Sequence, residues 1–252
     1  MESLEATLSD ITRQYELQQT KNDVIALVSH EMRTPLTAIQ GMTELLADYD
    51  VDRERGREIH RAINDEVKRL THMITEYLDI TRLEAGASGI RRQPVRVEAL
   101  AERSLLMLEP LAAAGRIRLR RNFAPVEPLL ADPDLLARAL DNLISNAIKY
   151  SPPGTEVTLS VRGENGAVVV DVADQGYGIP PEHLEHVFQK FFRVPRLQDA
   201  DVAGTGLGLA FVREIAGLHG GTVTVRSEID RGSVFTLRLP VNPPYGEIGG
   251  GA

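Results

Sequence analysis

The sequence contains no cysteine. Disulfide bonds, thiolate metal sites and thiol nucleophiles are therefore excluded, and this composition fits a reducing compartment. The sequence also lacks an apolar run long enough to cross a bilayer, and its N-terminus has no basic segment followed by an apolar one. We therefore expect a cytoplasmic chain without direct membrane insertion, either free or as the cytoplasmic part of a membrane-anchored protein.

Positive charge is also scarce, because 28 Lys and Arg residues stand against 36 Asp and Glu residues, for a net charge of −8. This balance argues against a nucleic-acid partner, since affinity for phosphate backbones comes from clustered basic residues. The densest basic run is Arg116, Arg118, Arg120 and Arg121. Because it alternates with apolar residues, we interpret the run as the solvated face of a strand.

The first residues carry a heptad pattern. Leu4, Leu8, Ile11 and Tyr15 step by alternating intervals of four and three, and the same register reaches Ile25. Such a seam predicts a coiled coil, which we place at residues 1–22 as a signalling helix. Because the pattern starts without a domain-opening signal, we expect an upstream sensor domain to be missing from this chain.

A helical hairpin is predicted over residues 23–88. The apolar period continues to Leu46, breaks around 48–52, and resumes in a second amphipathic helix that ends near Glu84. Two long helices with one apolar stripe each cannot bury those stripes well alone. We therefore predict a homodimer in which two hairpins form a four-helix bundle.

From Pro94 the pattern changes to alternating short strands and helices. We predict strands at 117–121, 157–162, 168–173, 222–228 and 233–239, and helices at 97–113, 133–149 and 206–219. Tight turns join consecutive strands, so the sheet should be mixed but largely antiparallel, with helices on one face. The predicted fold class is thus α + α/β, with a layered α/β domain at 94–240 and a disordered tail at 241–252.

The first candidate site lies on the first long helix, at Ser29-His30-Glu31-Met32-Arg33-Thr34-Pro35. We expect His30 to be exposed at the bundle surface beside a carboxylate that could take its proton, which suits a nucleophile with its base. Thr34 lies one turn further on the same face as His30. The alternative is a solvated surface histidine, the commoner role of such a residue outside a motif.

A second candidate lies on the helix predicted at 133–149. Asn142, Asn146 and Lys149 share one face, which suits a triphosphate and its Mg²⁺, because this ion prefers oxygen ligands and keeps several waters. Taken alone, the segment is better interpreted as a helix with a polar outer face.

Two glycine-containing segments follow. Asp174-Gln175-Gly176-Tyr177-Gly178 comes directly after an apolar strand, so the backbone can approach a flat ligand while Asp174 accepts a hydrogen bond. Gly204-Thr205-Gly206-Leu207-Gly208 opens a helix and offers bare amides to an anion. The alternatives are a tight turn for the first and a chance glycine pattern for the second, which matches neither a P-loop nor a Rossmann motif.

The order of these segments is more specific than any one of them. Together with Phe188-Gln189-Lys190-Phe191-Phe192-Arg193, they resemble the H, N, G1, F and G2 boxes of bacterial two-component sensor histidine kinases. The resemblance covers residues 20–240. It is to the catalytic core of that family, which consists of a dimerisation and histidine-phosphotransfer domain and an ATP-binding catalytic domain.

The resemblance implies a role for each site residue. His30 is the phosphoacceptor, Glu31 its neighbouring base, and Thr34 the residue that positions a water to dephosphorylate the partner. Arg193 meets the γ-phosphate, and 194–203 forms a lid over ATP. Asp174 accepts from the adenine amino group, and Asn146 is the Mg²⁺ ligand. The remaining cofactor-binding residues contact phosphate or ribose or frame the pocket: Asn142, Lys149, Tyr150, Gly176, Gly178, Gly204, Gly206 and Gly208.

The function expected from this resemblance is ATP-dependent phosphorylation of His30 and transfer of the phosphoryl group to an aspartate of a response regulator, in signal transduction. Two alternatives come from other classes. An ATP-driven conformational machine would need a transducer domain after the ATP pocket. A non-catalytic scaffold would bind nucleotide without transfer, and the intact His30, Asn146, Asp174 and Arg193 argue against it.

Overall fold

The computed structural model describes residues 29, 32–85, 90–195 and 204–242. The chain divides into two compact units, Met1–Thr75 and Glu76–Ala252, and each is described by itself. The predicted coiled-coil helix at 1–22 lies outside the described residues. Among the residues that are described, no helix combines the length and the apolar character needed to cross a bilayer.

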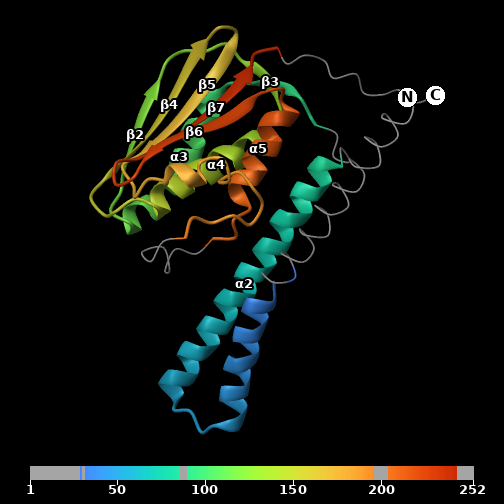
Figure 1. The fold of residues 1–252 in the computed structure, drawn as a ribbon, viewed down its shortest axis with the longest axis vertical. Coiled ribbons are helices and arrows are strands. Elements are labelled where there is room, and N and C mark those ends of the chain that lie inside the picture. The colour runs from blue at the N-terminus through green and yellow to red at the C-terminus, as the bar shows by residue number, and fades with distance from the viewer. Residues whose placement is uncertain (1–28, 30–31, 86–89, 196–203, 243–252) are drawn as a thin grey trace, which may run out of the picture. The chain divides into compact units, whose positions relative to one another are not determined.

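The first unit contains the predicted helical hairpin (Figure 1). Residues 32–48 are helical, and α2 (Arg53–Glu84) begins after a short turn and continues into the second unit. Asp52 Oδ1 accepts hydrogen bonds from the backbone N–H groups of Glu54 and Arg55, each at 2.9 Å, so two free donors at the start of α2 are satisfied. The predicted break at 48–52 and the predicted end near Glu84 are confirmed.

The hairpin leaves a large apolar surface uncovered within its own unit. Leu36 and Leu45 on the first helix are 53% and 42% exposed, and Val67 and Ile74 on α2 are 46% and 37% exposed. Exposed aliphatic side chains repeated along both helices are typical of an association surface.

The second unit is built on a five-stranded sheet of order β2-β4-β5-β7-β6. β2 (Arg118–Phe123) pairs in parallel with β4 (Glu156–Glu164). The other pairs are antiparallel and involve β5 (Ala167–Asp174), β6 (Thr222–Glu228) and β7 (Gly232–Pro240). The prediction of a mixed, largely antiparallel sheet is therefore confirmed.

Three helices cover one face of this sheet: α3 (Val97–Ala114), α4 (Pro133–Lys149) and α5 (Gly208–Leu218) (Figure 1). The strands alternate accordingly, and in β4 the side chains of Val157, Leu159 and Val161 are buried while their neighbours are partly exposed. Leu140 and Leu143 of α4 are fully buried. The unit is thus a two-layer α/β structure with its core between helices and sheet.

Three residues of the basic run, Arg118, Arg120 and Arg121, lie on the edge strand β2, whereas Arg116 precedes the strand and has a left-handed φ of 56°. Ile117, just before the strand, is buried, whereas Arg118 and Arg120 are exposed. Arg120 Nε lies 2.5 Å from Glu156 Oε2 on the neighbouring strand, and Arg121 pairs with Glu102 of α3. These two arginines at the sheet edge therefore have acidic partners within the same unit.

Three short elements were not predicted. β1 (Gln93–Val95) pairs antiparallel with β3 (Leu129–Ala131), and a 3-10 turn spans Pro181–His183. Helix α5 begins at Gly208, two residues later than expected, because Gly206 has a left-handed φ of 70° and cannot be part of the helix.

Candidate functional site

The candidate site begins at the end of β5, where Asp174 is half-buried. Its Oδ1 accepts hydrogen bonds from the backbone N–H groups of Gly176, at 2.8 Å, and Ser233, at 3.1 Å. Burial raises the pKa of this carboxyl to about 6, although the two amide donors oppose the shift. A carboxylate held at a fixed orientation with a poorly solvated charge is suited to accept a hydrogen bond from a ligand.

The turn after Asp174 approaches other backbone segments too closely for side chains. A Cβ on Gly178, whose φ is +65°, would lie 2.0 Å from the carbonyl oxygen of Glu228. A Cβ on Gly176 would lie 2.3 Å from the carbonyl oxygen of Tyr150, and Tyr177 N donates to that same oxygen at 3.2 Å. The predicted glycines therefore bring the turn against the C-terminal end of α4.

Helix α4 supplies the polar face that was predicted. Asn142 and Asn146 are half-buried and Lys149 is exposed, while Leu143, Ile144 and Ile148 are buried. Asn142 Nδ2 donates to the carbonyl of Arg138 at 3.0 Å, which fixes the orientation of the amide. Its Oδ1 then faces the backbone of Gly208, where an added Cβ would lie only 2.5 Å away.

The glycine-containing loop at 204–208 is held from two sides. Phe191 N donates to the carbonyl of Gly206 at 2.8 Å, and a Cβ on Gly206 would lie 2.7 Å from the carbonyl carbon of Phe191. The Thr205 hydroxyl donates to the carboxylate of Glu76 at 2.6 Å and accepts from Leu207 N at 3.3 Å. The loop conformation therefore depends on residues distant in the sequence.

The aromatic segment before the loop lies within the same unit. Phe191 packs 6.0 Å from the Tyr77 ring, centroid to centroid, and Phe188 lies edge-on to Phe235 at 6.3 Å. Lys190 Nζ lies 2.7 Å from Glu84 Oε2. Arg193 is exposed at the end of this segment, and most of the predicted lid lies outside the described residues.

The second unit thus brings together three predicted segments: the turn after β5, the polar face of α4 and the loop before α5. The contacts of Tyr150 with the turn and of Asn142 with Gly208 link them directly. His30 and Glu31 lie outside the described residues, and Thr34 is exposed on the helix at 32–48 in the first unit.

Sequence reasoning missed three residues of this site. Ser233 and Gly232 at the start of β7 contact Asp174: Ser233 N donates to it, and a Cβ on Gly232 would lie 2.0 Å from the Asp174 carbonyl oxygen. The glycine just before the last predicted strand was the signal available for this pair. Glu76, which accepts from Thr205, gives no such signal, because an acidic residue on an amphipathic helix is ordinary.

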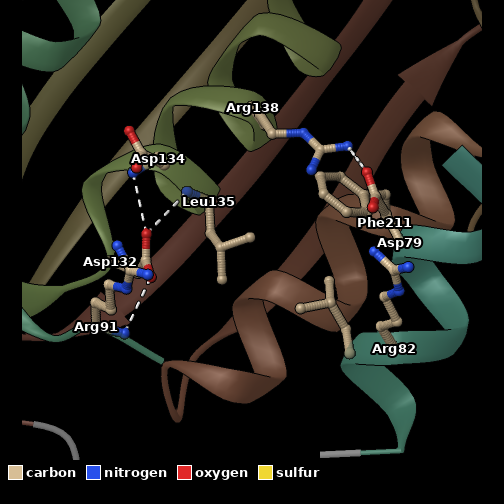
Figure 2. Close-up of a pocket in the computed structure, with 9 residues that line it drawn as sticks. Asp79, Arg82, Arg91, Asp132, Asp134, Leu135, Arg138 and Phe211 are labelled. Carbon is tan, nitrogen blue, oxygen red and sulfur yellow. Dashed lines mark hydrogen bonds and ion pairs between the residues drawn. The ribbon is translucent and has the colours of Figure 1, made fainter. Parts of the chain in front are cut away.

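A separate cavity of about 390 Å³ opens beside the start of α4 (Figure 2). Arg138 lies 4.2 Å over the Phe211 ring there, and its guanidinium donates to Asp79 at 2.5 Å. Asp132 caps α4 by accepting from Asp134 N and Leu135 N. None of the site residues predicted from the sequence lines this cavity.

Two family models match the chain in the expected order. Residues 20–86 match the His Kinase A (phospho-acceptor) domain, and residues 131–243 match the histidine kinase-, DNA gyrase B- and HSP90-like ATPase domain. With the fold and site described above, they show that the chain belongs to the two-component sensor histidine kinases, a family of ATP-dependent protein-histidine kinases.

Individual proteins that resemble this chain are consistent with that family. Sensor protein SrrB of Staphylococcus aureus (strain MRSA252) is 33% identical over 235 residues, which are 93% of this chain and 40% of that protein. The full-length structure of ShkA in complex with AMPPNP is 29% identical, with a TM-score of 0.66 over 87% of this chain and 46% of that one. Histidine kinase ThkA, in complex with response regulator protein TrrA, has a TM-score of 0.70 at 23% identity, over 87% and 61%.

Proposed function

We propose that this chain is a catalytic core that phosphorylates its own His30 from Mg-ATP and passes the phosphoryl group to an aspartate of a response regulator. The observation that carries the proposal is the assembly of the Asp174 turn, the α4 polar face and the 204–208 loop in one unit. The same chain carries the His30 motif. The nucleotide analogue in ShkA and the response regulator bound to ThkA support this assignment.

In this proposal Asp174 accepts a hydrogen bond from the adenine amino group. Its Oδ1 already accepts from two backbone amides, so the carboxylate is oriented before the ligand arrives. Gly176 and Gly178 let the flat base approach the backbone, and Tyr150 follows directly on α4 for contact with the ribose or phosphates. Gly204, Gly206 and Gly208 present amides to the phosphates, and Lys149 supplies positive charge.

The residues of α4 also fit a magnesium ion. The side-chain oxygen of Asn146 is a neutral ligand of the kind Mg²⁺ accepts, and it lies one turn from Asn142 on the half-buried face. The triphosphate itself would provide further oxygen ligands. When bound, the ion would neutralise phosphate charge during transfer.

The transfer is a displacement at phosphorus. A ring nitrogen of His30 attacks the γ-phosphorus, the bond from phosphorus to the β,γ-bridging oxygen breaks, and ADP leaves with that electron pair. Glu31 takes the proton that the imidazole loses, and Arg193 offsets negative charge on the phosphoryl group. The phosphorus–nitrogen bond so formed then breaks when an aspartate carboxylate of the response regulator attacks.

We also propose that the chain works as a homodimer. Leu36, Leu45, Val67 and Ile74 are exposed in the isolated hairpin, and two hairpins packed as a four-helix bundle would bury such side chains. The response regulator would bind to this bundle near His30.

Incubation with γ-³²P-labelled ATP and Mg²⁺ tests the proposed reaction. A protein-bound label that is lost in acid and stable in base is expected, because a phosphorus–nitrogen bond hydrolyses in acid. Release of labelled phosphate without labelled protein would favour the conformational machine instead. Binding of nucleotide with neither label nor hydrolysis would favour the scaffold.

Replacing Thr34 by Ala is expected to leave autophosphorylation unchanged and to slow dephosphorylation of the phosphorylated response regulator by about tenfold. A hydroxyl one turn from His30 can hold a water by hydrogen bonding but has no evident part in taking phosphate from ATP. The measurement is the decay of purified phosphorylated regulator with each variant present. Thr37→Ala, an exposed threonine on the same helix, is the matched control, and equal decay with all three proteins would remove Thr34 from the mechanism.

A further inference from the structure

Helices α4 and α5 are joined by three contacts that fix one antiparallel register. Asp132 N donates to His219 Nε2 at 3.0 Å, the Arg138 guanidinium covers the Phe211 ring at 4.2 Å, and Asn142 abuts Gly208. From the first contact to the third, the residue number on the α4 side rises from 132 to 142. The residue number on the α5 side falls from 219 to 208, so the two helices run antiparallel. Two of the α4 partners, Asp132 and Arg138, are seen in Figure 2.

The first of these contacts is buried and specific. His219 has no exposed surface, and it is the residue that caps the C-terminal end of α5. Its Nδ1 lies 2.8 Å from the carbonyl oxygen of Ile215, so Nδ1 carries the proton and Nε2 is free to accept from Asp132. Burial lowers the pKa of this imidazole, which keeps it in the neutral form that can accept.

Asp132 transmits this contact to the start of α4. Its carboxylate accepts from the backbone N–H groups of Asp134, at 3.1 Å, and Leu135, at 3.2 Å, and also from Arg91 N at 3.0 Å. Asp132 therefore both donates its amide to His219 and fixes the first turn of α4.

The contact at the other end lies within the candidate nucleotide site. Gly208 closes the loop proposed to bind phosphates, and Asn142 belongs to the α4 face proposed to meet them. Because an added Cβ on Gly208 would lie 2.5 Å from Asn142 Oδ1, the two segments already touch. If α5 slid along α4, the two halves of the phosphate site would therefore either move apart or clash.

We infer that His219 is a positioning residue of the nucleotide site, which sets the spacing between the 204–208 loop and the α4 polar face by holding the amide of Asp132. The inference rests on the proposed ATP function. His219 lies about 16 Å from Gly208 along α5, so it acts through the helix and does not touch the nucleotide. The triphosphate should depend on this spacing, whereas the adenine end, bound at Asp174, should not.

Two substitutions at this position separate the hydrogen bonds of His219. His219→Asn is too short to reach Asp132 but can still donate to the Ile215 carbonyl of its own helix. His219→Gln is longer and can place an oxygen near the position of Nε2. We expect His219→Asn to weaken ATP binding about tenfold, with adenosine binding, followed by NMR titration, changed less than twofold. His219→Gln should recover ATP affinity to within about threefold of wild type.

Val161→Ala is the control for general destabilisation, because it leaves a cavity in the buried core of β4 without touching the contacts between the two helices. It should lower the unfolding temperature and leave ATP affinity unchanged well below that temperature. Equal loss of ATP and adenosine affinity in His219→Asn, or no more loss than in Val161→Ala, would overturn the inference.

A second measurement uses the wild-type chain and remains valid if His219→Asn does not fold. If the bond from Asp132 to His219 favours ATP, ATP must favour the bond to the same extent. The amide proton of Asp132 should therefore exchange more slowly with solvent when ATP is bound, and an unchanged rate would overturn the inference. A wild-type chain that binds no ATP would refute the proposed function itself, and the inference with it.

Discussion

Replacing Asp174 by Asn is expected to weaken ATP binding by about 30- to 150-fold, which corresponds to about 2 to 3 kcal/mol for a lost charge-assisted hydrogen bond. The backbone amides of Gly176 and Ser233 both donate to Oδ1. The oxygen of Asn would take that position, which turns its NH₂ group toward the adenine amino group. Two donors then face each other, and calorimetric titration with Mg-ATP measures the loss.

The same variant should fold as well as the wild type. Because burial raises the pKa of Asp174 to about 6, its ionised form at pH 7 costs stability, and Asn removes that cost while keeping both amide hydrogen bonds. Asp171→Asn is the matched control on the same strand. It removes the ion pair with Arg162 and should lower the unfolding temperature without affecting ATP binding. Unchanged ATP affinity in Asp174→Asn would mean that the adenine binds elsewhere.

The raised pKa also predicts a pH dependence of binding. Below pH 6 the free protein holds a proton on Asp174, and that proton must be released before the carboxylate can accept from adenine. The wild-type affinity should therefore fall as pH drops below 6, approaching tenfold per pH unit, while Asp174→Asn shows a flat profile. The contribution of Asp174 to folding stability changes with pH in the opposite direction to its contribution to ATP binding. The stability associated with the protonated carboxyl is fully present below about pH 4 and is lost as pH rises through 6.

Replacing His30 by Gln is expected to abolish labelling of the protein from γ-³²P ATP and to leave the dissociation constant for ATP within about twofold of wild type. Glutamine has no nucleophilic nitrogen of comparable reactivity, and the proposed nucleotide contacts all come from residues after 140. This variant is therefore expected to lose the acid-labile label completely while its ATP titration stays close to that of the wild type.

His60→Gln is the matched control, because it makes the same replacement at a histidine that is exposed on α2, where its Nδ1 lies 2.6 Å from the carbonyl oxygen of Gly56. This variant should be labelled like the wild type. Labelling of His30→Gln would place the phosphorylated residue elsewhere, and failure of both histidine variants to accept label would point to damage of the hairpin.

Secondary structure was predictable where the periodicity was long or the ends were marked. Helix α4 begins at Pro133 and ends at Lys149 as expected, because Asp132 and Pro133 form a capped start. Strand β6 also matches its predicted bounds. By contrast, β1 and β3 have three residues each, too few for an alternating pattern, and they form only because each is the partner of the other.

The candidate site shows the same division. Asp174, Asn146 and the glycines could be named as candidates from the sequence because the order of their segments along the chain is specific. Ser233 and Glu76 could not, since they reach the site through pairing across 59 and 129 residues that no local pattern encodes. The structure also adds what spacing alone could not give, namely that Asn142 touches Gly208 and that Asp174 is buried enough to raise its pKa.

The arginines of β2 have a consequence for the behaviour of the folded protein at high concentration. β2 is one of the two edge strands of the five-stranded sheet, and a free edge can add a strand from another molecule and so start aggregation. Arg118, Arg120 and Arg121 are exposed along this edge, although Glu156 and Glu102 lie close by. Two such edges brought together would place guanidinium groups of one copy against those of the other. The charge on β2 thus opposes pairing of this edge with the same edge of another copy.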